Sequence, residues 1–264
     1  MRKITFALAV ALLFGFLVSC GGCAGCAGCS KTVKLETKQE GFYNEKLGVY
    51  YSIAPSSYEA IGYVKEAYAV DSHGFTFHIV TDMGGNRAEA SDWLYDATNA
   101  ALIYNSDKKL PTLKEMKPAT VDFFVEGNTR VNLISLDVAD EINKIIECLD
   151  NPSCSQSSIR AELNDSYGLR FTSPEYKYFA YVIDYVEFSQ NIYEYEKAEG
   201  YTDASDIEAR YDFRDGVEYE IVAEEDGSYT VKYDYGKYFV YDKNVGRYYM
   251  ASYIHDTYNS GENK

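Results

Sequence analysis

Four cysteines near the N-terminus are the residues whose type and spacing come closest to a chemical site. They are Cys20, Cys23, Cys26 and Cys29, each separated from the next by two residues. Thiolates at this C-x-x-C spacing can bind zinc or an iron–sulfur cluster. Here only Gly and Ala lie between them, so no larger side chain would shield a cluster, and the spacing departs from the bacterial ferredoxin run. We therefore predict no metal and no cofactor, and a flexible tether instead.

The remaining residues offer no catalytic constellation. None of His73, His78 and His255 has a partner at the spacing of a catalytic or metal-binding motif. The 41 acidic residues place carboxylates at every spacing, so no pair stands out. Residues 212–218 carry Arg214 among their acids, which disfavours a calcium loop. The sequence therefore predicts neither catalytic residues nor metal ligands.

Residues 1–19 have the three parts of an export signal. Arg2 and Lys3 are basic, and a predominantly apolar run from Ile4 to Val18 follows. That run is shorter than the ~20 residues that a helix needs to cross a bilayer. It fits the basic, apolar and small-residue regions of a signal peptide. We predict that residues 1–19 are removed on export.

This segment ends in Leu17-Val18-Ser19-Cys20, which resembles the lipobox of bacterial lipoproteins. The resemblance implies cleavage before Cys20, lipid on its thiol, and attachment to a membrane through acyl chains such as palmitate. Cys20 would then be a thioether and could not serve as a metal ligand. Gly21 stands where an Asp often retains such proteins in the inner membrane, which favours the outer membrane or the cell surface.

The chain is acidic, with a formal net charge of −16 at pH 7. Such a charge repels nucleic acid, so the sequence excludes a nucleic-acid partner. Acidic residues are densest between positions 194 and 226, whereas Lys31, Lys34 and Lys38 lie close to the cysteine segment. We expect the basic segment to lie near an anionic bilayer and the acidic half to stand away from it.

The aromatic content indicates a folded protein rich in β-structure. The chain has 27 Tyr, 13 Phe and only 5 Pro, and aromatic residues are enriched in strands and depleted in disordered segments. We predict an α+β, β-rich fold whose antiparallel sheets are built from successive hairpins, with one or two packed helices. Residues 20–40 are the predicted tether and 256–264 a disordered tail. Residues 41–255 form the globular body, either whole or as subdomains 41–165 and 166–255.

Alternation and turn residues place the elements. Hairpins are predicted over 60–80, 120–136, 217–235 and 238–250. Residues 176–188 are apolar on both faces, which is typical of a central strand. A helix over 138–149 has an apolar stripe and Asp137 as its cap, and a second helix is expected over 91–104.

Two further cysteines flank the end of the first predicted helix. Cys148 lies in its last turn, and Cys154 lies just beyond Pro152. In an exported protein, two cysteines at this spacing favour a local disulfide over reactive thiols. Because the closed loop is small, the bond would hold the helix end rather than the whole fold.

The tyrosines near the C-terminus divide into two groups. One group shares a strand face with Val and Ile and is predicted to be core: Tyr219, Tyr229 and Tyr233. The other lies among glutamates with little aliphatic sequence and is predicted to be exposed: Tyr193, Tyr195 and Tyr201. An exposed Tyr offers apolar area and a hydroxyl at small entropic cost, which suits a ligand-binding surface.

These features support two classes of function for an exported, membrane-anchored lipoprotein. The first is a non-catalytic surface binding or adhesion module for an envelope protein, a glycan, a peptide or a host protein. The second is a structural or assembly scaffold of the cell envelope. A hydrolase that uses carboxylates ranks third, because no acidic pair stands out. Aromatic residues gathered on an exposed face or cleft would favour the first class.

Replacing Cys20 with Ser tests the lipid anchor. The variant should accumulate as the full-length precursor and take up no labelled fatty acid, because the thiol that accepts the lipid is gone. Metabolic labelling and gel mobility measure the two effects. Cys23→Ser is the matched control and should be processed and labelled like the wild type. A Cys20→Ser variant that is still cleaved at the same bond and labelled would contradict the lipoprotein assignment.

Overall fold

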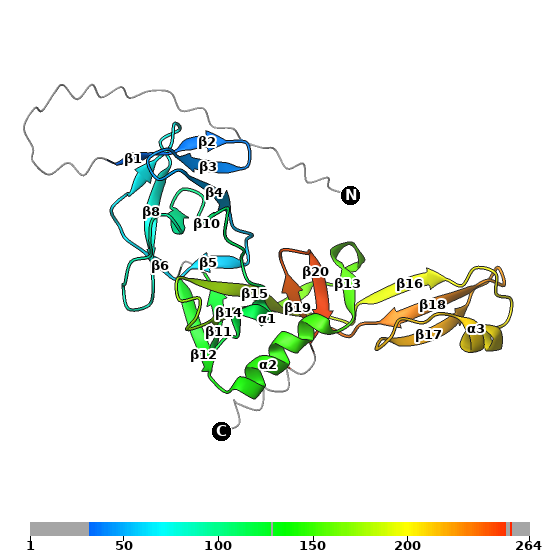
Figure 1. Cartoon of the computed structure of the whole chain (residues 1–264). Coiled ribbons are helices and arrows are strands. Elements are labelled where there is room, and N and C mark those ends of the chain that lie inside the picture. The colour runs from blue at the N-terminus through cyan, green and yellow to red at the C-terminus, as the bar shows by residue number, and fades with distance from the viewer. Residues whose placement is uncertain (1–31, 128, 252–253, 255–264) are drawn as a thin grey trace, which may run out of the picture. The chain divides into compact units, whose positions relative to one another are not determined.

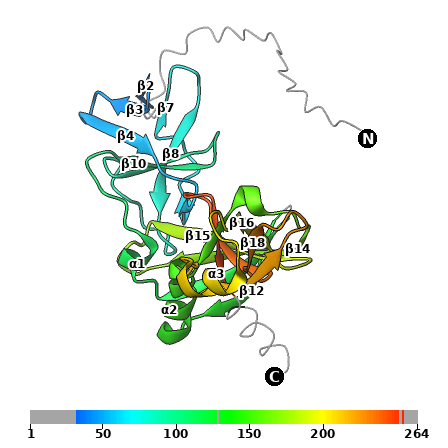
Figure 2. The same ribbon diagram turned by 90° about the vertical axis from the view of Figure 1, so that its right-hand side faces the viewer.

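The computed structural model describes residues 32–127, 129–251 and 254. The predicted export signal, the four cysteines of the predicted tether, His255 and the predicted C-terminal tail lie outside these residues. The described residues belong to one compact unit that begins at Thr32. Within them the chain forms three sheets and a few short helices (Figures 1 and 2). The expected β-rich fold with antiparallel sheets and few helices is therefore confirmed.

The first sheet has nine strands and nearly closes on itself. They are β1 (Val33–Lys34), β2 (Glu36–Lys38), β3 (Gly41–Asn44), β4 (Val49–Ile53), β6 (Gly62–Tyr63), β7 (Ala69–Val70), β8 (Thr76–Thr81), β9 (Trp93–Asp96) and β10 (Ala101–Asn105). β1 pairs with β7 in parallel, and the other pairs are antiparallel. β1 and β2 stand at the two ends of the strand order but are separated in the chain only by Leu35, so the edges approach each other. Tyr51, Phe77 and Leu94 fill the interior.

The predicted tether therefore ends earlier than residue 40. Residues 33 to 38 belong to β1 and β2 of the first sheet, and buried Leu35 lies between these strands. The mixed charge of this segment hid the short strands, because only Val33 and Leu35 carry its apolar signal.

The second sheet has eight strands, and all its pairs are antiparallel. They are β5 (Tyr58–Ala60), β11 (Thr120–Glu126), β12 (Arg130–Leu136), β13 (Ser153–Ser155), β14 (Leu163–Thr172), β15 (Phe179–Phe188), β19 (Tyr238–Asp242) and β20 (Arg247–Met250). Several neighbours are far apart in the chain, such as β15 with β19 and β13 with β20. The sheet is thus more than a run of successive hairpins. A boundary between 165 and 166 would fall inside β14.

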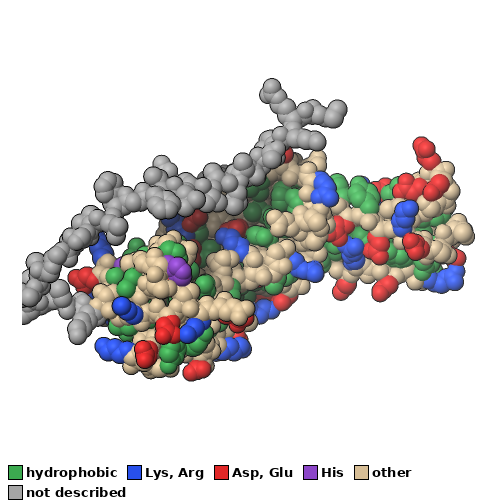
Figure 3. Space-filling view, turned by 90° about the horizontal axis from the view of Figure 1, so that it is seen from above, with side chains coloured by type: hydrophobic (Ala, Val, Ile, Leu, Met, Phe, Trp, Pro, Cys, Tyr) green, Lys and Arg blue, Asp and Glu red, His purple; other side chains and the backbone are tan. Residues whose placement is uncertain are grey.

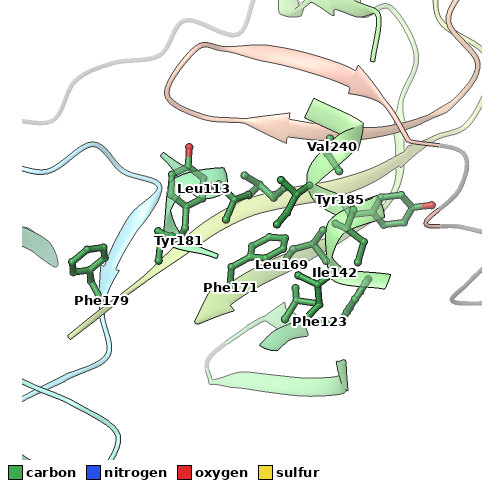
Figure 4. Close-up of a cluster of buried hydrophobic side chains, with 14 of the residues drawn as sticks. Leu113, Phe123, Ile142, Leu169, Phe171, Phe179, Tyr181, Tyr185 and Val240 are labelled. Atoms are coloured by element: carbon green, nitrogen blue, oxygen red, sulfur yellow. The ribbon is translucent and has the colours of Figure 1, made fainter. Parts of the chain in front are cut away.

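β15 is the central strand of this sheet and is buried on both faces. Tyr181, Ile183 and Tyr185 belong to the main core cluster. Figure 4 shows Tyr181 and Tyr185 beside side chains from β11, β14 and α2. Val186 and Phe188 belong to a second cluster. The prediction of a two-sided apolar strand is confirmed, because both faces of β15 meet other apolar side chains.

The helices are short. They are α1 (Leu113–Met116), α2 (Ala139–Glu147) and α3 (Ala204–Arg210), with 3-10 turns at η1 (Cys148–Asp150) and η2 (Gln156–Ser158). α2 confirms the predicted stripe: Ile142, Ile145 and Ile146 are buried in the main cluster. The predicted cap is wrong, because the cap position is Val138, which has no side-chain hydrogen bond, and Asp137 lies outside the helix.

The helix expected over 91–104 is also wrong, since this segment forms the β9–β10 hairpin. Leu94 and Ile103 face the interior of the first sheet, while Trp93 and Tyr104 pack against the main cluster. Apolar residues on both faces of two strands imitate a helical stripe. The turn is made by buried Asp96, whose carboxylate accepts hydrogen bonds from the backbone N–H groups that follow it.

The hairpins β11–β12 and β19–β20 lie as predicted. A third sheet holds the predicted hairpin of β17 (Glu218–Ala223) and β18 (Tyr229–Asp234), with β16 (Tyr193–Lys197) on the other side of β18. The hairpin expected over 60–80 is present, because β6 and β7 both pair antiparallel with β8. Its first arm is interrupted between β6 and β7, and Ala60 belongs to β5, which joins the second sheet.

The structure also differs from the predicted disulfide, because Cys148 and Cys154 are both free and buried. Cys148 packs in the main cluster beside the α2 isoleucines, whereas Cys154 packs in the second cluster. Each thiol is thus part of a different apolar core. Burial raises the pKa of the Cys148 thiol to about 11 and that of Cys154 to about 12.

These two thiols should therefore resist alkylation in the folded protein. Iodoacetamide at pH 8, followed by peptide mapping, should leave Cys148 and Cys154 unmodified until denaturant is added, because the thiolate is the reactive form and both are buried. The tether cysteines provide an internal comparison in the same digest. A Cys148–Cys154 crosslinked peptide in protein isolated without reductant would contradict the free thiols and show that the predicted disulfide forms.

Candidate functional site

Two of the three predicted surface tyrosines meet on one face of the third sheet. Tyr193 and Tyr195 alternate along β16, opposite Asp234 and Lys232 of β18. Tyr195 is 66% exposed. The Lys232 ammonium lies 4.4 Å from the centroid of the Tyr193 ring, a cation–π geometry. Alternation therefore brings two aromatic rings and a cation to the same solvent face, here called the tyrosine face.

β17 adds acidic side chains to the tyrosine face. The register places Glu218 opposite Asp234, and Glu220 opposite Lys232. The Glu220 carboxylate lies 3.2 Å from the Lys232 ammonium. Figure 3 shows acidic and basic side chains interspersed over the end of the molecule formed by β16, β17, β18 and α3. Such a face can stack on a ligand and form charge-assisted hydrogen bonds to it.

Tyr201 does not join the tyrosine face. It packs edge-on against Tyr211 at 5.9 Å between ring centroids, and its hydroxyl donates to the backbone oxygen of Arg210 at 3.2 Å. The residue is half-buried against the second cluster. These partners lie at the C-terminal end of helix α3, a contact that the local run of acids did not reveal.

Arg214 lies on the opposite face of the third sheet and contacts residues of its strands. Its guanidinium donates to Glu194 of β16 and, at 2.6 Å, to the Tyr235 hydroxyl. It also lies 4.3 Å from the centroid of the buried Tyr233 ring. Because Arg214 comes from the loop after α3, these contacts fasten that loop to β16 and β18. Sequence reasoning considered Arg214 only as a residue that disfavours calcium, because its partners lie 18 or more residues away in the chain.

Tyr219 corrects one part of the predicted core. Tyr233 is fully buried and Tyr229 is half-buried, but Tyr219 is 45% exposed and stacks on Phe213 with 3.8 Å between ring centroids. It occupies the same face as Tyr233, as alternation predicted. Tyr219 lies on β17, however, which is an edge strand of the third sheet, whereas Tyr233 lies on the central strand β18. Position in the sheet, rather than alternation, decides its exposure.

The described histidines have structural contacts. The His78 ring is buried, with Nδ1 2.9 Å from the Val64 oxygen and Nε2 3.3 Å from Thr76 Oγ1. His73 lies in an exposed turn beside Asp71. Among the described residues, no group of three or more His, Cys, Asp or Glu side chains is arranged to hold a metal ion. No helix within the same residues is both long and apolar enough to span a membrane.

Comparison of the chain with protein-family models, with curated proteins and with solved structures finds no match in any of the three. The candidate functional surface is therefore defined by the geometry of the tyrosine face and by its anchoring through Arg214.

The ion pair between Arg214 and Glu194 should make the stability of the protein depend on pH. Burial disfavours the ionised Glu194 carboxylate, but hydrogen bonds from Ser158 and Arg214 outweigh burial and hold its pKa below the ordinary 4.5. A lowered folded-state pKa adds stability that is present above pH ~4.5 and is lost as the pH falls through the folded value.

Glu194→Gln should therefore lower the free energy of unfolding at pH 7 by about 2 kcal/mol, the usual size for a hydrogen bond to a charged group. The difference from the wild type should shrink as the pH falls below about 4.5. Urea unfolding across this pH range measures it. Glu225→Gln, at an exposed position in the β17–β18 turn, is the control and should change little. A Glu194→Gln difference that stays constant down to pH 3 would contradict the assigned ion pair.

Proposed function

We propose that this protein is an exported lipoprotein, anchored by acyl chains on Cys20, that acts as a non-catalytic binding or adhesion module. Its ligand surface is the tyrosine face of the third sheet. The observation that carries the proposal is the placement of half-buried Tyr193 and exposed Tyr195 on the same solvent-facing side of the third sheet. The Lys232 ammonium lies over the Tyr193 ring. The lipobox resemblance supports the anchor, and the tyrosine face supports the binding role.

The shape and charge of this surface limit the class of ligand that it can bind. The tyrosine face is an open sheet face, which suits a peptide or protein better than a small molecule held in a cavity. Glu218 and Glu220 border it, and the chain as a whole is acidic. Complementary charge steers association, so a basic segment of an envelope or host protein fits best.

One observation favours the alternative of an assembly scaffold. β12 is an end strand of the second sheet, and β11 is its strand partner within the described residues. Val131 and Leu133 are exposed on it, and positions 131 to 136 carry no charge. By contrast, the edge strands β16 and β17 carry alternating glutamates, a common protection against strand addition. An uncharged edge can accept a strand from another envelope protein.

Replacing Tyr193 and Tyr195 together with Ala tests the binding proposal. The double variant should lose about tenfold or more in affinity for peptides that the wild type captures from arrays of basic, neutral and acidic sequences, because aromatic side chains dominate such contacts. The melting temperature should stay nearly unchanged, since both rings lie on the solvent face.

Tyr219→Ala removes an exposed tyrosine from the other face of the same sheet and is the matched control. It should bind like the wild type. Equal binding by the double variant and the wild type would move the ligand surface elsewhere, and an array on which the wild type captures nothing would favour the scaffold. Turnover of a captured peptide would instead favour the hydrolase.

A further inference from the structure

A hollow separate from the tyrosine face lies on the polar side of the second sheet. It has a volume of about 280 Å³, and the residues that line it come from four strands and one turn: Glu59, Phe124, Glu126, Ser166, Gly168, Val182, Asp184 and Lys243. The register explains the gathering, because Phe124 lies opposite Gly168, and Gly168 lies opposite Asp184. This face is the reverse of the one that packs on α2.

One wall of the hollow is a fixed stack. The Phe124 ring lies directly over Gly168, where a Cβ atom would come within 2.0 Å of it, so only glycine fits. Arg130 covers the ring from above, with Cζ 3.9 Å from its centroid. Two parallel hydrogen bonds of 2.8 Å tie Arg130 to Glu59, and a third of 2.6 Å ties it to Glu126. The wall is thus held in place before any ligand arrives.

The opposite wall is a second ion pair, Asp184 with Lys243 at 3.0 Å. Arg170 stands beside the first wall: its Nε is buried, has no hydrogen-bond acceptor among the described residues, and lies 3.7 Å from the Glu59 carboxylate. The lining therefore has three carboxylates and three cations nearby. The carboxylates belong to Glu59, Glu126 and Asp184, and the cations to Lys243, Arg130 and Arg170.

We propose that this hollow binds one sugar ring of a neutral glycan. A hydroxyl group both donates and accepts hydrogen bonds, so a polyol can use carboxylates and cations at the same time. A ligand with a net charge finds no unbalanced charge to pair with, and an apolar ligand finds little beyond Val182 and the edge of Phe124. The volume lies just below the ~300–1,000 Å³ range of ligand sites, which suits a single ring.

The test uses the purified full chain and a panel of methyl hexosides and methyl N-acetylhexosaminides at millimolar concentration, followed by saturation-transfer NMR. At least one neutral glycoside should bind, and Asp184→Asn should weaken it about tenfold or more, as loss of a charge-assisted hydrogen bond does. A methyl glucuronide and a methyl glucosaminide, which carry opposite charges on similar rings, should bind more weakly than the neutral glycoside.

Lys243→Gln, at an exposed position in the β19–β20 turn, gives an independent variant if Asp184→Asn lowers the melting temperature. Tyr195→Ala should leave glycoside binding unchanged, which separates this site from the tyrosine face. The proposal is overturned if no neutral glycoside binds, if a charged glycoside binds best, or if Asp184→Asn and Lys243→Gln both bind like the wild type.

Discussion

The burial of β15 on both faces is the constraint on which the described fold depends. A strand with two apolar faces is stable only when other elements cover both of them. On one face, Ile183 and Tyr185 meet the α2 isoleucines in the main cluster. On the other, Val186 and Phe188 meet Phe239 and the apolar residues of the third sheet in the second cluster. The two cores are therefore joined through one strand.

This arrangement positions both candidate surfaces. The chain leaves β15 at Phe188 and enters β16 through buried Ile192, so the tyrosine face begins a few residues from the end of the central strand. The polar hollow lies on β15 itself, at Asp184, where the cover from the second cluster has ended. One strand thus places an aromatic surface at one end and an ion-paired hollow nearer its middle.

Features encoded locally could be predicted from the sequence. The stripe of α2 and the turns of the β11–β12 and β17–β18 hairpins involve residues close together in the chain, and all three were predicted correctly. The two apolar faces of β15 were also legible, because alternation within one strand records them. Tyr195 was identified as exposed for the same local reason, whereas Tyr193 is half-buried beneath Lys232.

Features that depend on distant partners could not be predicted. β9 and β10 read as a helix because apolar residues on both faces of the hairpin meet two different cores. Spacing suggested that Cys148 and Cys154 were linked, but the chain turns one thiol into each cluster. The exposure of Tyr219 follows from its place on an edge strand. The stack of Arg130 on Phe124 and Gly168 joins three strands, and no local sequence pattern predicts the order of all three in the sheet.

Hydrogen exchange in an Ile183→Ala variant tests the central role of β15 most directly. Ile183 is fully buried, and removing most of its side chain should cost about 2–5 kcal/mol. If β15 joins the two cores, the slowest amides of β11, β14 and β18 should all exchange faster by the same factor, because they open with the whole unit. Faster exchange in β11 and β14 with unchanged protection in β18 would show that the third sheet is stable by itself, and would contradict this account.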